Sequence, residues 1–143
     1  MPGTDSAARR KPRLAADQRN RLLIAAKAAL QHAYAPYSRF QVGAAVLTES
    51  GAVFTGCNVE NSSYGLTTCA ERTAIGSAVA AEGPAMRIRA IAVWSHPERP
   101  CAPCGACRQV IAEFGPEAVV LFQGQDAVQE LRARELLPAG FIL

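Results

Sequence analysis

The sequence predicts an α/β domain in which helices cover both faces of one sheet, giving three layers. A β-hairpin pattern in residues 41–59 is followed by helices that alternate with short apolar strands, as is typical of this class. The chain has 143 residues, half of them hydrophobic, which is enough for one core of ordinary domain size. We therefore expect a single domain over residues 15–143, preceded by a basic, disordered leader over residues 1–14.

The first half of this domain is expected to form a helix and then the hairpin. Asp17 can cap a helix over about residues 17–33. One face of this helix carries the apolar residues Leu22, Leu23, Ala26 and Leu30. The hairpin strands are residues 41–48 and 52–59, and Gly51 suits the turn between them.

The second half is expected to alternate between helices and strands. The predicted order is a helix over 69–82, a strand over 89–94, a loop over 97–103, a helix over 104–114 and a strand over 119–122. Residues 127–137 suit a helix or a strand equally. Both cysteine-bearing segments then fall where a strand gives way to a helix, and such transitions line the ligand crevice of open α/β sheets.

Charge and hydropathy argue against several functions. The net charge is only +3, and much of the excess lies at Arg9, Arg10, Lys11 and Arg13, so the domain offers no basic surface for nucleic acid. No apolar run reaches membrane-spanning length, and no signal-peptide pattern opens the chain. The five cysteines, three of them within seven residues, suit metal binding in a reducing compartment. We expect a cytoplasmic protein with no nucleic-acid or membrane partner.

The cysteines are placed to bind a metal ion. Cys104 and Cys107 share a face in the first turn of one predicted helix, and Cys69 begins another. The helix dipole favours thiolates at these positions, and zinc takes thiolate ligands. Cys101 has the same spacing to Cys104, so four thiols could close a structural site, whereas three would leave a position for water. Spacing alone does not decide, but Cys101 precedes Pro103 in the loop, which favours the other three cysteines as ligands.

Glu71 lies two residues after Cys69. Residues two apart do not share a helical face, so Glu71 is a poor fellow ligand but can border the same pocket. A carboxylate beside zinc that does not bind it suits proton transfer. Taken alone, Glu71 is better explained as an acid that complements the helix dipole.

Several longer stretches carry a family resemblance. The segments YAPYSRFQVGAAV, GCNVENSSYGLTTCAERTAI, PCGACRQVI and ELLPAGF resemble the small, homotetrameric, zinc-dependent cytidine deaminases over roughly residues 17–142. The pairing of CAE with PCxxC is characteristic of the wider deaminase superfamily. The resemblance implies a three-layer α-β-α cytidine-deaminase-like fold with a mixed sheet of about five strands. It also implies hydrolytic deamination of cytidine and 2′-deoxycytidine to uridine and 2′-deoxyuridine, with release of ammonia, in pyrimidine salvage.

The resemblance also implies roles for residues around the metal. One zinc ion per subunit would be held by Cys69, Cys104 and Cys107, with Glu71 as the proton shuttle. The backbone N–H of Ala70 would hold the pyrimidine carbonyl. Three thiolates and Zn²⁺ sum to one negative charge, which a neighbouring cation should balance. Arg72 and Arg108 each follow a motif directly, and the resemblance favours Arg72.

The remaining implied residues bind the nucleoside. Asn58 and Glu60 would recognise the ribose 3′-hydroxyl, and Phe40 would line the pocket. Tyr64 and Phe141 would come from a neighbouring subunit, so the active sites of a homotetramer would be shared.

Three alternatives are weighed against this interpretation. A blasticidin S type deaminase would share the zinc chemistry, but Asn58, Glu60 and the ELLPAGF segment argue against it. A nucleic-acid deaminase would need a basic channel that the composition does not supply. In a binding module with a closed four-cysteine structural zinc, Glu71 would have no function at the metal.

Overall fold

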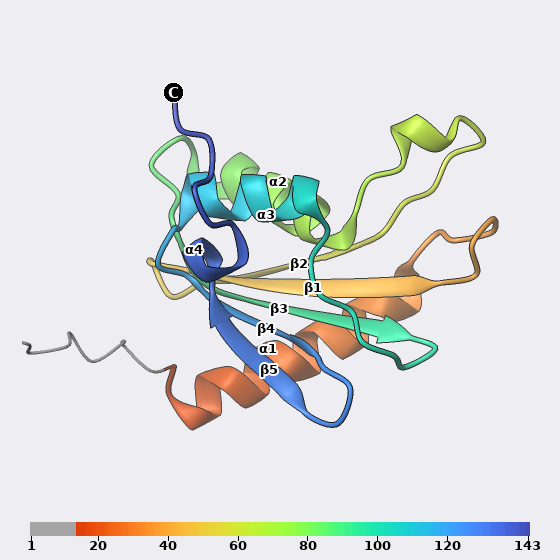
Figure 1. Ribbon diagram of the computed structural model, residues 1–143, viewed down its shortest axis with the longest axis horizontal. Coiled ribbons are helices and arrows are strands. Elements are labelled where there is room, and N and C mark those ends of the chain that lie inside the picture. Colours follow the sequence, from red (N-terminus) through yellow and green to blue (C-terminus); the bar gives the residue numbers. More distant parts are fainter. Residues whose placement is uncertain (1–13) are drawn as a thin grey trace, which may run out of the picture.

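The computed structural model describes residues 14–143, so the expected leader falls almost wholly outside the described residues. The element order is α1 (Ala16–Ala29), η1 (Leu30–His32), β1 (Gln41–Thr48), β2 (Val53–Cys57), η2 (Tyr64–Leu66), α2 (Ala70–Glu82), β3 (Ile88–His96), α3 (Gly105–Phe114), β4 (Val119–Gln123), β5 (Val128–Arg132) and α4 (Ala133–Leu136). Helix α1 covers one face of the sheet, and α2 and α3 lie side by side over the other (Figure 1). The predicted three-layer α/β class is confirmed.

The sheet has five strands in the order β2-β1-β3-β4-β5. Strand β1 pairs antiparallel with β2 and with β3, and β4 pairs antiparallel with β5. Strands β3 and β4 are parallel, so the chain must cross over between them, and α3 forms this crossover. The sheet is therefore mixed, as the sequence indicated.

Strand β1 separates two apolar cores. Its side chains alternate in direction, so Ala44 and Val46 pack on the α2 side of the sheet. Ala45 and Leu47 pack on the opposite side, with Leu22, Leu23 and Ala26 of α1. A strand buried on both faces explains why β1 reads as a continuous apolar run. No helix in residues 14–143 is both long and apolar enough to cross a membrane.

Some element boundaries differ from the expected ones. The N-cap of α1 is Ala15, not Asp17, which lies in the first turn. The Gln18 side chain accepts a hydrogen bond from the Ala15 N–H at 3.3 Å, and Asp17 complements the helix dipole from the first turn. Residues 127–137 form a strand and then a short helix, β5 and α4, so both readings of that segment were partly right.

Two glycines allow the helices to approach the sheet. A Cβ atom on Gly56 of β2 would lie 2.4 Å from the backbone nitrogen of Ala74 and 2.6 Å from the carbonyl oxygen of Ala70. Gly43 of β1 meets the backbone of α1 equally closely, 2.0 Å from the Ala26 oxygen. Helix α2 therefore packs against bare backbone, and this contact fixes where its first turn lies.

Replacing Gly56→Ala is expected to lower the free energy of unfolding by about 1–3 kcal/mol, because the methyl group overlaps the backbone of α2. Gly76→Ala is the matched control. Gly76 lies in α2 itself, and a Cβ atom added there would meet nothing within 4 Å. That control is expected to stabilise the protein by about 0.5–1 kcal/mol. Urea denaturation measures both, and equal stabilities of the two variants would contradict the proposed contact.

Candidate metal centre and its surroundings

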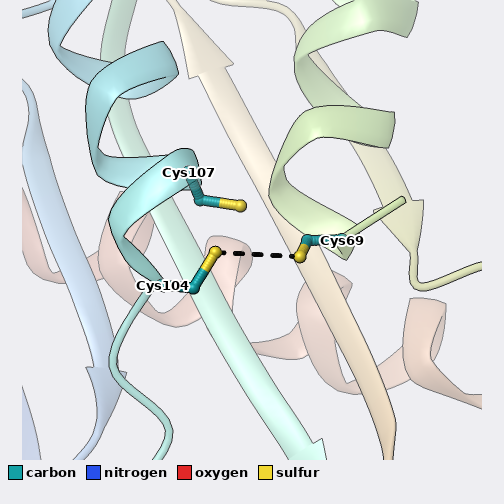
Figure 2. A group of neighbouring side chains, drawn as sticks. All are labelled: Cys69, Cys104 and Cys107. Atoms are coloured by element: carbon teal, nitrogen blue, oxygen red, sulfur yellow. Dashed lines mark hydrogen bonds between the residues drawn. The ribbon is translucent and has the colours of Figure 1, made fainter. Parts of the chain in front are cut away.

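The N-termini of α2 and α3 meet and bring three cysteines together. Cys69 is the N-cap of α2, Cys104 is the N-cap of α3, and Cys107 lies in the first turn of α3. Their sulfur atoms all lie within 4.8 Å of one another, and those of Cys69 and Cys104 are 3.8 Å apart (Figure 2). No other group of three or more acidic, histidine or cysteine ligands comes together within residues 14–143.

This geometry fits zinc. Four tetrahedral ligands at a Zn–S distance of about 2.3 Å lie about 3.8 Å from one another, which is the Cys69–Cys104 separation. Cys107 is buried, Cys69 is half-buried and Cys104 is exposed, so one side of the cluster is open. Three thiolates therefore leave one of four tetrahedral positions free, as in sites that bind a water or a substrate.

The cysteines of this cluster share protons among themselves. Hydrogen bonding with Cys107, together with that from Arg72, lowers the pKa of Cys69 to about 5. The same interaction raises the pKa of Cys107, because it keeps the shared proton. At neutral pH the group therefore already contains a thiolate, which is the form that zinc binds.

Glu71 is the carboxylate nearest this cluster in the sequence. It lies in the first turn of α2 and is only 4% exposed. Burial raises the pKa of Glu71 to about 7, although a hydrogen bond with Cys107 opposes the shift. The carboxyl group is not part of the three-ligand group. It is therefore placed to exchange a proton near neutral pH rather than to complete the metal coordination.

The two arginines that follow the motifs have different surroundings. Arg72 donates a hydrogen bond from Nη2 to the sulfur of Cys69 at 3.4 Å, and the thiolates raise the pKa of Arg72. Arg108 instead donates to the carbonyl oxygens of Pro103 at 2.7 Å and Leu136 at 3.1 Å. Arg108 thus ties the loop before Cys104 to the end of α4, a role that sequence reasoning missed because both acceptors are distant main-chain atoms.

Cys101 lies outside the cluster. Its backbone N–H donates to the carbonyl oxygen of Gln123 at 3.0 Å, and the residue packs against the core. Burial raises the pKa of Cys101 to about 11. Its sulfur is not part of the three-thiol group.

Hydrogen bonds join the two segments expected to bind the nucleoside, residues 37–42 and residues 58–60. Asn58 lies just beyond β2; its Oδ1 accepts from the Val42 N–H and its Nδ2 donates to the Phe40 carbonyl, both at 2.8 Å. Glu60 accepts from the N–H groups of Tyr37 and Ser38 and from the Ser38 hydroxyl. These bonds, the hydroxyl first, hold the pKa of Glu60 below its usual value. Ser38 was missed from the sequence.

Tyr64 and Phe141 are both highly exposed, at 75% and 72%. The tyrosine lies in η2 with its ring edge-on to Tyr37, at 5.7 Å between centroids. The carbonyl oxygen of Phe141 accepts from Gln109 of α3 at 3.0 Å. The two segments lie at opposite ends of the molecule (Figure 1), so they do not meet within one chain.

Comparisons with known proteins agree with this site. The model of the cytidine and deoxycytidylate deaminase zinc-binding region matches residues 16–123. A cytidine deaminase of Halalkalibacterium halodurans is 50% identical over 125 residues, which are 86% of this chain and 93% of that protein. The crystal structure of a cytidine deaminase from Burkholderia pseudomallei has a TM-score of 0.77 and 52% identity, covering 85% of this chain and 98% of that one. A blasticidin-S deaminase of Bacillus cereus is 32% identical over 112 residues, 73% of this chain and 79% of that one.

Cys101→Ser is expected to keep one zinc ion per chain, whereas Cys104→Ser and Cys107→Ser are expected to lose it, because only the latter two remove a thiolate from the cluster. Elemental analysis of the purified variants measures the zinc content. Loss of zinc from the Cys101 variant would instead indicate a four-cysteine structural site.

Proposed function

The chain belongs to the cytidine and deoxycytidylate deaminase family, and we propose that it deaminates cytidine and 2′-deoxycytidine to uridine and 2′-deoxyuridine, with release of ammonia. The observation that carries this proposal is the buried Glu71 directly after the Cys69 ligand, beside a three-thiol cluster that leaves one position open. Cys69, Cys104 and Cys107 would hold one zinc ion.

The chemistry requires a nucleophile and a proton carrier. Bound zinc lowers the pKa of a water in its open position toward about 7, which supplies the nucleophile at neutral pH. The Glu71 carboxylate accepts a proton from the attacking water and delivers it to N3 of the pyrimidine as the water oxygen bonds to C4. It then transfers the second proton of that oxygen to the amino group, the C4–N bond breaks, and ammonia leaves. One carboxyl group with a pKa near neutrality can perform both transfers.

Two groups near the cluster would assist this reaction. Ala70 is the first residue of α2, where backbone N–H groups have no helical acceptor, and its N–H would hold the pyrimidine carbonyl. Arg72 would balance the negative charge of three thiolates around one dication, which its hydrogen bond to Cys69 supports.

The nucleoside would lie between the metal and the turn that carries Glu60. Asn58 and Glu60 would recognise the 3′-hydroxyl of the sugar, and Phe40 would line the pocket. The direct hydrogen bond from Asn58 to the Phe40 carbonyl supports a common binding site for these residues, because it holds two of them next to each other.

We further propose that the active sites are shared in a homotetramer. Tyr64 and Phe141 would each reach the site of a neighbouring subunit. Their high exposure and the positions of their segments at opposite ends of the molecule support this arrangement, since large exposed aromatic groups are typical of contact surfaces. The protein would act in pyrimidine salvage in the cytoplasm.

Glu71→Gln is expected to retain zinc and to lower the turnover of cytidine by roughly 10²–10⁴-fold, because glutamine cannot carry a proton. The loss of ultraviolet absorbance on conversion of cytidine to uridine measures turnover. No conversion by the unaltered, zinc-loaded chain would favour a structural zinc module, and conversion of blasticidin S alone would favour the other deaminase type.

Removing residues 141–143 is expected to raise KM for cytidine at least tenfold while zinc stays bound, because the ring of Phe141 would no longer pack on the pyrimidine of a neighbouring site. The matched control removes only Ile142 and Leu143 and is expected to keep the KM of the full chain. Initial rates over a range of cytidine concentrations measure both. Unchanged kinetics after the longer deletion would exclude Phe141 from the site.

A further inference from the structure

The side chain of Ser38 stands between two residues proposed to contact the substrate. Its hydroxyl lies 2.5 Å from Oε2 of Glu60 and 3.0 Å from the backbone nitrogen of Phe40. An N–H can only donate, so the hydroxyl accepts from Phe40 and its single proton goes to the carboxylate. The direction of both hydrogen bonds is therefore fixed.

The same contacts restrict what Glu60 can still bind. An ionised carboxylate has about four acceptor positions. Oε1 already accepts from the N–H groups of Tyr37 at 2.9 Å and Ser38 at 3.1 Å, and Oε2 accepts from the Ser38 hydroxyl. One acceptor position remains, on Oε2, and Glu60 is only partly buried, so a ligand can reach it. The Ser38 hydroxyl occupies the other position on this oxygen and so sets the direction in which the remaining one points.

The main chain of Phe40 is held from both sides. Its N–H donates to Ser38 and its carbonyl accepts from Asn58. The Ser38 hydroxyl therefore joins Glu60 to Phe40 through two hydrogen bonds, and the Phe40 carbonyl extends the connection to Asn58. A displacement of the Glu60 carboxylate relative to Phe40 would have to break one of these bonds.

We propose that Ser38 is a positioning residue for sugar recognition: its hydroxyl directs the remaining acceptor of Glu60 at the 3′-hydroxyl of the nucleoside. Ser38 thereby sets how strongly the enzyme prefers nucleosides that carry this hydroxyl. The inference rests on the proposed function, and it adds a residue that determines specificity without touching the substrate.

The test compares cytidine with 3′-deoxycytidine, which lacks the hydrogen-bond donor. Ser38→Ala is expected to lower kcat/KM for cytidine about tenfold, mostly through KM, which corresponds to about 1.4 kcal/mol and to the loss of one hydrogen bond to a charged group. The value for 3′-deoxycytidine is expected to change less than about twofold, because this substrate makes no bond to the redirected acceptor. Zinc content is expected to stay the same.

Two further variants separate positioning from folding. Ser38→Thr keeps the hydroxyl at an exposed position and is expected to restore most of the preference for cytidine. Ser77→Ala, an exposed serine of α2, is the matched control and is expected to leave both substrates unaffected. Equal losses on the two substrates in Ser38→Ala, or no loss on either, would overturn the inference while leaving the proposed function intact. Failure of the unaltered chain to convert cytidine would overturn the proposed function, and this inference with it.

Discussion

The site depends on the meeting of two helix N-termini, each of which begins at a cysteine. Cys69 and Cys104 are N-caps with extended backbone, so their sulfur atoms lie near free N–H groups and the positive ends of two helix dipoles. This environment favours thiolates before any metal is considered. Helix α2 reaches this position because Gly56 lets its first turns pack on bare backbone. Helix α3 reaches it because the parallel β3–β4 pair requires a crossover on the same face.

The loop before α3 shows why spacing alone is an incomplete signal. Cys101 and Cys104 have the same separation as Cys104 and Cys107, yet only the second pair joins Cys69. Cys101 is held instead by the hydrogen bond from its backbone to Gln123 at the end of β4. A three-residue spacing brings two side chains to one face only inside a helix, and Cys101 precedes the helix. The relevant property is therefore the spacing together with the point at which the helix begins.

Much of the fold and the centre of the site could be predicted from the sequence. Local sequence patterns located β1 and α3 within a residue, and the cysteine pattern located the cluster, because both signals are local. The cap of α1 was wrong because the helix begins earlier, with Ala15 as its N-cap, and Gln18 accepts from the N–H of that residue. The tie from Arg108 to Leu136 and the turn built around Ser38 could not be predicted, because each joins segments that only the tertiary fold brings together.

Two carboxylates in this domain show how environment assigns different properties to the same side chain. Glu71 is buried beside thiolates, so desolvation raises its pKa to about 7. Glu60 is only partly buried and accepts three hydrogen bonds from one turn, so its pKa is lowered. A group that must take and release a proton near neutral pH needs the first environment, and a group that must stay ionised as an acceptor needs the second. Burying Glu71 costs stability, because a charged or protonated carboxyl group is poorly solvated there. The proton transfer proposed for Glu71 at the adjacent cluster would account for this cost.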